Sequence, residues 1–148
     1  MKVSSSVTLA ATAEQVTELL LDLSRYPTWM PLVHSAEPET GASPAAWNVE
    51  LRARVGPFAR SKRLRMVLAS DVASGDGRVL VFERREATGA RHSEWIMTVR
   101  VTGGGDPTTV TIDLEYGGSL WTAGVLDRVL AAQIEAGKAG LARAVTND

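Results

Sequence analysis

The chain has 148 residues, of which 45% are hydrophobic and 22% are charged, a composition typical of a domain that buries a core. Its net charge of -1 gives no overall attraction to nucleic acid, and with no cysteine and two histidines it lacks the usual ligands of a zinc site. The N-terminus alternates polar and apolar residues, whereas a signal peptide needs an unbroken apolar stretch, and no segment has the length and apolarity of a membrane span. We therefore expect one cytoplasmic domain over residues 1–148, without a metal, a cofactor or a transmembrane segment.

The N-terminal region predicts a strand followed by a helix. Residues 3–9 alternate between apolar and polar side chains, the pattern of a strand with one buried face. Thr12 followed by Gln15 is typical of a capping box, and apolar residues then recur at helical spacing. The spacing predicts a helix from about Ala13 to Leu23.

The next stretch predicts a second, shorter helix. Ser24 is a suitable N-cap, Pro27 suits a first helical turn, and Pro31 disfavours helical backbone in the residue before it. The stretch also concentrates large apolar side chains in a chain that is only 5% aromatic, namely Tyr26, Trp29 and Met30. We expect these side chains to form part of the wall of a hollow, or otherwise to cap the core.

Six further strands and one long helix follow. Apolar and polar residues alternate in segments separated by short turns, at about 33–39, 47–55, 64–68, 78–86, 95–101 and 110–116. Apolar residues then follow helical spacing from Val125 to Val145. Strands joined by short turns are antiparallel neighbours, and their apolar face needs a cover that only the long helix is large enough to provide. A single helix leaves room for a hollow beside it.

This order of elements carries a family resemblance. Together with the segments "YPTWMP", "ARVGPFARSKRLRM" and "VLDRVLAAQIEAGKAGL", the chain resembles the START-like helix-grip superfamily, in its polyketide cyclase/dehydrase and lipid-transport branch. The resemblance implies an α+β helix-grip fold, in which a seven-stranded curved antiparallel sheet wraps around the long C-terminal helix and encloses a hydrophobic cavity. Members bind lipids, hormones, quinones or polyketides, and only some are enzymes.

The candidate ligand-binding residues have large apolar side chains. They occupy the inward-facing positions of the strands or lie on the helices. Such side chains suit a pocket of a few hundred Å³, although each also suits an ordinary core. The candidates are Trp29, Met30, Trp47, Phe58, Met66, Phe82, Trp95, Met97, Tyr116, Leu126 and Leu130.

Phe58 differs from the other candidates because it lies in a turn, directly after Gly56 and Pro57. The resemblance implies that this loop closes over the mouth of the cavity. We expect Phe58 to contact a ligand or the long helix near Val125, or alternatively to pack permanently under the turn.

Catalytic residues are not assigned, because no nucleophile elbow, phosphate loop or metalloprotease motif is present. The run "ERRE" places Glu83 and Arg85 on one face of a strand and Arg84 and Glu86 on the other. The inward pair would polarise a carbonyl, whereas an outer charge network with Arg63 or Arg65 is the alternative. His34 and His92 have the acid–base chemistry for catalysis but stand at strand ends, where histidines are usually solvated.

Basic residues concentrate around one predicted hairpin. Their side chains form a solvated strand face or dock an acidic carrier protein or an anionic head group. The residues are Arg52, Arg54, Arg60, Lys62, Arg63 and Arg65.

Three functions follow from these observations. The first is binding or carrying a small hydrophobic molecule, such as a lipid, a quinone or a polyketide-like compound. The second is the activity of a polyketide cyclase/aromatase or dehydratase, and the third is a protein-interaction or toxin-like regulatory module.

Overall fold

Seven strands form one antiparallel sheet in the computed structural model, which describes residues 2–55, 57–86, 92–103, 107–117 and 125–146, except for the side chains of 55, 58, 125–127, 129, 130 and 146. The strands are β1 (Lys2–Leu9), β2 (Val33–Pro38), β3 (Ala46–Val55), β4 (Phe58–Ser74), β5 (Gly77–Arg84), β6 (Trp95–Thr102) and β7 (Thr108–Tyr116). Their order in the sheet is β1-β7-β6-β5-β4-β3-β2. Consecutive strands from β2 to β7 are therefore neighbours, as the short turns predict.

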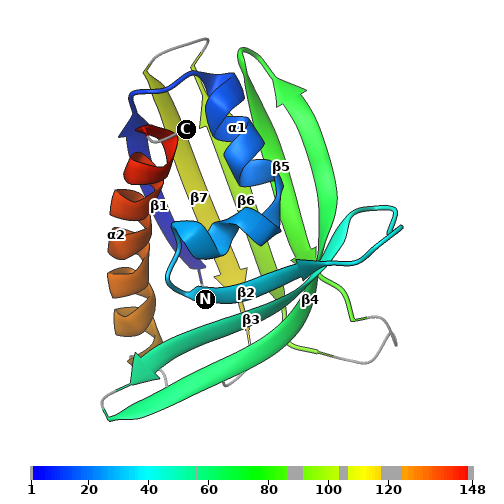
Figure 1. Ribbon diagram of the computed structural model, residues 1–148, viewed down its shortest axis with the longest axis vertical. Coiled ribbons are helices and arrows are strands. Elements are labelled where there is room, and N and C mark those ends of the chain that lie inside the picture. The colour runs from blue at the N-terminus through cyan, green and yellow to red at the C-terminus, as the bar shows by residue number, and fades with distance from the viewer. Residues whose placement is uncertain (1, 56, 87–91, 104–106, 118–124, 147–148) are drawn as a thin grey trace.

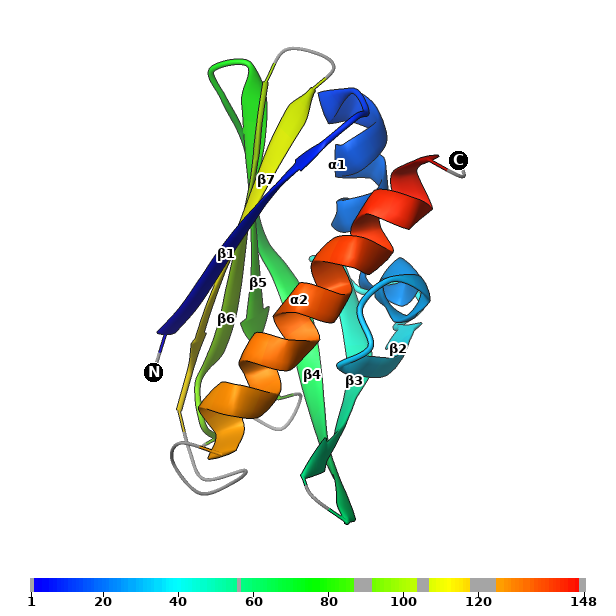
Figure 2. The same ribbon diagram turned by 90° about the vertical axis from the view of Figure 1, so that its left-hand side faces the viewer.

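The helices of the described residues lie on one face of this sheet (Figure 1). They are α1 (Ala13–Leu21), the 3₁₀ helix η1 (Leu23–Thr28) and α2 (Val125–Thr146). Figure 2 shows the sheet curving so that α2 runs between the part formed by β1 and β7 and the part formed by β2 and β3. The predicted α+β helix-grip fold is confirmed. None of the described helices combines the length and apolarity needed to cross a membrane.

The boundary between the first two helices differs from the prediction. The Thr12–Gln15 capping box is present, but α1 ends at Leu21 because Asp22 has extended backbone angles. The Asp22 carboxylate accepts hydrogen bonds from Ser24 N at 2.9 Å and Ser24 Oγ at 2.7 Å, so Asp22, not Ser24, caps the second helix. Consequently Pro27 lies near the end of η1 rather than in its first turn.

An aromatic cluster fastens η1 to the sheet. Tyr26 is fully buried, and its ring centroid lies 4.7 Å from that of Trp29 and 6.3 Å from that of Phe82. Trp47 contacts the same Phe82 ring at 5.8 Å. These contacts fill the core at the α1 end of the sheet, while the space between the sheet and α2 is packed less completely.

Candidate functional site

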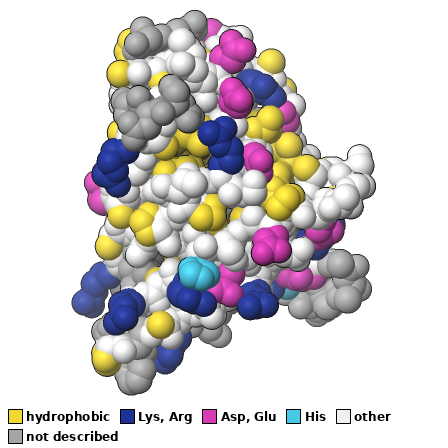
Figure 3. All heavy atoms as spheres, in the orientation of Figure 1, with side chains coloured by type: hydrophobic (Ala, Val, Ile, Leu, Met, Phe, Trp, Pro, Cys, Tyr) yellow, Lys and Arg dark blue, Asp and Glu magenta, His cyan; other side chains and the backbone are white. Residues whose placement is uncertain are grey.

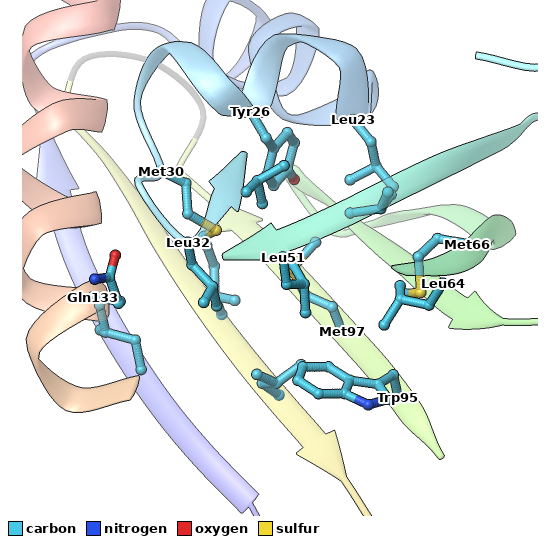
Figure 4. Close-up of a pocket in the computed structure, with 15 residues that line it drawn as sticks. Leu23, Tyr26, Met30, Leu32, Leu51, Leu64, Met66, Trp95, Met97 and Gln133 are labelled. Carbon is cyan, nitrogen blue, oxygen red and sulfur yellow. The ribbon is translucent and has the colours of Figure 1, made fainter. Parts of the chain in front are cut away.

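A cavity of about 90 Å³ lies between the curved sheet and α2. Its wall comes from η1 and the following turn, from β2, β3, β4, β6 and β7, and from α2: Leu23, Tyr26, Met30, Leu32, Val33, Val49, Leu51, Leu64, Met66, Trp95, Met97, Ile112, Leu114, Gln133 and Ile134. Figure 4 shows Trp95 across one end, Tyr26 and Met30 near the other, and Gln133 approaching from α2. The cavity is smaller than the few hundred Å³ expected, because these large side chains occupy much of the space.

The residues of the wall are mostly apolar, and each of the others has a buried polar atom. The Tyr26 hydroxyl donates to Leu20 O at 2.8 Å, and burial raises the pKa of Tyr26 above its ordinary value, so this group does not exchange protons near neutral pH. Trp95 Nε1 and Gln133 Oε1 are buried without a hydrogen-bond partner among the described residues. The surface that the wall presents to the cavity is therefore apolar.

A second, smaller hollow adjoins the cavity. It has a volume of about 50 Å³ and lies between β1, β7 and α2, where Trp29 and Leu141 contribute to its wall. Met30, Ile112 and Ile134 line both spaces. The two spaces are therefore neighbours that share part of their walls.

The structure places the predicted site residues in three groups. Met30, Met66, Trp95 and Met97 line the cavity, and Trp29 lines the smaller hollow. Trp47, Phe82 and Tyr116 are buried behind the wall. The side chains of Phe58, Leu126 and Leu130 lie outside the described residues, so the proposed gate at Phe58 stays a prediction.

The residues behind the wall hold other elements in place. Trp47 Nε1 donates to the Asp22 carboxylate at 3.1 Å, which links β3 to the helix boundary. Tyr116 stacks on Trp95 with ring centroids 5.5 Å apart and so supports one end of the cavity.

Several wall residues were not among the candidates. Val49, Leu51, Leu64 and Leu114 have the inward parity of their strands, but their moderate size does not distinguish them in the sequence from ordinary core residues. Gln133 is also part of the wall. The sequence feature that identifies Gln133 is its position as a polar residue on the apolar face of a helix, three positions after Leu130 and directly before Ile134.

The charged run of the fifth strand has Arg84 on the cavity side. Arg84 stands opposite Met66 in the β4–β5 pair, and directly opposed residues share a face of the sheet. Glu83 and Arg85 lie on the outer face and form an ion pair of 3.5 Å. His34 and His92 are both exposed, and neither lines the cavity.

The basic run is divided between the two faces of the hairpin. Register places Arg60 and Lys62 on the cavity side, opposite Ala53 and Leu51. On the outer face, Arg52 and Arg63 both pair with Glu50, at 2.7 and 3.2 Å. Figure 3 shows Lys and Arg side chains gathered over the lower part of the molecule, where Figure 1 places this hairpin.

Comparison with known proteins agrees with this geometry. The model of the family described as "Polyketide cyclase / dehydrase and lipid transport" matches residues 1–146. No curated protein matches the chain.

Solved structures share the fold at low sequence identity. A START superfamily protein from Mycobacterium smegmatis has a TM-score of 0.69 at 16% identity, over 99% of this chain and 97% of that one. The Zhui aromatase/cyclase from a Streptomyces species has a TM-score of 0.64 at 18% identity, over 99% and 93%. A STAR-related lipid transfer protein from Xanthomonas axonopodis has a TM-score of 0.69 at 16% identity, over 98% and 85%.

Proposed function

Because the chain belongs to the polyketide cyclase/dehydrase and lipid transport family, we propose that it binds a small hydrophobic molecule in the cavity between the sheet and α2. The observation that carries this proposal is the cavity itself, whose accessible surface is apolar. Predominantly apolar walls are typical of small-molecule sites. In this role the apolar wall supplies the affinity.

The wall favours binding over catalysis. Tyr26 is a titratable group of the wall, and its hydroxyl is already bonded to Leu20 O. A cyclase or dehydratase needs a group that transfers a proton at the reacting atom, and the described wall residues offer no free one. A lipid, a quinone or a polyketide-like compound all fit the apolar character of the wall. An acidic carrier protein and a cytoplasmic location stay predictions.

Calorimetric titration with 1-octanol tests the proposal, using two variants on adjacent residues of β6. Met97 lines the cavity, whereas Ile96 points to the outer face, opposite Glu115. Met97→Trp fills part of the cavity, so we expect it to weaken octanol binding at least tenfold. Ile96→Trp adds the same side chain outside and should leave binding unchanged. Equal binding by both variants, or no saturable binding across a panel of apolar compounds, would contradict the proposal.

A further inference from the structure

β4 extends beyond the end of its pairing with β5, next to the cavity, as far as the described residues show. β5 pairs with β4 as far as Arg84, opposite Met66, and one more backbone hydrogen bond joins Arg85 N to Arg65 O at 3.0 Å. Earlier β4 residues therefore have only β3 as a described strand neighbour. Lys62 lies in this part, opposite the cavity-lining Leu51. Lys62 and Arg84 thus share the cavity face of the sheet.

Ser93 connects these two cations at the end of the cavity. Lys62 Nζ donates to Ser93 Oγ at 3.2 Å, and Arg84 Nη1 donates to the same oxygen at 3.0 Å. Arg84 Nη1 also donates to Ser93 O at 3.3 Å. Ser93 precedes Trp95, which crosses that end of the cavity (Figure 4), by two residues. The polar cluster therefore adjoins the apolar wall.

The cluster carries more positive than negative charge. Glu86 Oε1 accepts from Arg84 Nε at 2.8 Å, whereas Lys62 forms no salt bridge with any described residue. Desolvation and the neighbouring Arg84 hold the pKa of Lys62 below its ordinary value, with Glu86 acting in the opposite direction. Partly buried cations that repel each other are stabilised by a bound anion.

We propose that Lys62, Arg84 and Ser93 bind the anionic end of a hydrophobic ligand, with a carboxylate as its simplest form, while the apolar part enters the cavity past Leu51 and Leu64. The proposal rests on the proposed function and specifies its ligand class. The carboxylate oxygens accept hydrogen bonds from Lys62 Nζ and the Arg84 guanidinium. A neutral ligand of the same shape leaves the charge of Lys62 unbalanced.

Titrations of octanoate and 1-octanol into the protein at neutral pH and low salt test this assignment. We expect wild-type protein to bind octanoate at least tenfold more tightly than 1-octanol. Lys62→Met retains an unbranched side chain without charge, so it should remove this preference and leave octanol affinity unchanged. Arg63→Met is the matched control, because Arg63 is the next residue on the opposite face and its side chain is 86% exposed. It should retain the preference, as should Lys62→Arg.

Each outcome has a distinct meaning. If octanol binds at least as tightly as octanoate, the anionic head group is excluded while the proposed function stands. A preference for octanoate that persists in Lys62→Met overturns the role of Lys62. Failure of both ligands to bind overturns this inference together with the proposed function. The comparison of the two ligands on wild-type protein needs no variant, so poor folding of Lys62→Met cannot obscure the result.

Discussion

A single carboxylate, that of Asp22, connects three elements. It accepts hydrogen bonds from Ser24 N, from Ser24 Oγ and from Trp47 Nε1, so it caps η1 at the end of α1 and fastens both to β3. Partial burial raises the pKa of Asp22, but the hydrogen bonds from Ser24 and Trp47 outweigh it, and the net pKa lies below the ordinary 3.8.

This lowered pKa predicts an acid-dependent part of the stability. A carboxyl with a depressed folded-state pKa contributes stability that is fully present above the unfolded value of 3.8 and is lost as the pH falls through the folded pKa. Urea unfolding between pH 6 and pH 2 should show wild-type protein losing more stability than Asp22→Asn. Parallel pH curves for the two proteins would show that the charge of Asp22 has no such role.

At the scale of elements, α2 and the turn after η1 approach each other closely. A Cβ atom on Gly140 would lie 2.1 Å from Trp29 O, whereas one on Gly137 would have the Trp29 side chain as its nearest neighbour, at 3.8 Å. Two glycines one turn apart on the same helix therefore have different roles.

Alanine substitutions should separate these roles. Gly140→Ala forces α2 away from the Trp29 backbone, so we expect a loss of about 1–3 kcal/mol in the free energy of unfolding. Gly137→Ala meets no clash and gains helix propensity, so it should be neutral or stabilise by up to about 1 kcal/mol. Urea denaturation measures both. Equal effects of the two substitutions would show that the contact with Trp29 does not limit the approach of the helix.

At the scale of the whole molecule, the cavity couples ligand binding to stability. A ligand that binds only the folded state adds its binding free energy to the stability of the protein.

Thermal unfolding should therefore respond to an apolar ligand. Octanol at a concentration of 100 times its Kd should raise the free energy of unfolding by about 2.7 kcal/mol, which corresponds to about 5–10 °C in Tm. Met97→Trp should show no such rise. A rise of the same size in that variant would indicate that octanol stabilises the protein from another site.

The sequence predicted seven strands and most of their buried faces, because burial of one face imposes a period of two on the side chains. It predicted only 64–68 of the fourth strand, whereas β4 spans Phe58–Ser74, because the alternation is clear only where apolar side chains face inward. It did not predict the cap at Asp22, since serine and aspartate are equally good N-caps and the choice depends on Trp47, distant in sequence. The sequence also did not decide on which face of the sheet Arg84 lies. That face depends on the register between β5 and β4, which shifts at a bulge between Leu68 and Ser70.

The cavity wall was predicted only in part, for a similar reason. Trp47 and Trp95 both have inward parity, yet only Trp95 lines the cavity, because η1 packs over the end of the sheet where Trp47 lies. Size and parity identify inward side chains, and the packing of the helices decides which of them border the space.

The order of the sheet has a consequence for how the chain folds as it is synthesised. Lys2 of β1 pairs with Glu115 of β7, so the first strand of the sheet lacks its neighbour until β7 has been synthesised. Strands β2 to β6 can pair in the order of their synthesis, each with the strand before it. Contacts between residues far apart in sequence form slowly, and unpaired strands expose edges that aggregate. The joining of β1 to β7 is therefore the pairing of this sheet that closes the longest loop, and the edge of β1 stays open longest during synthesis.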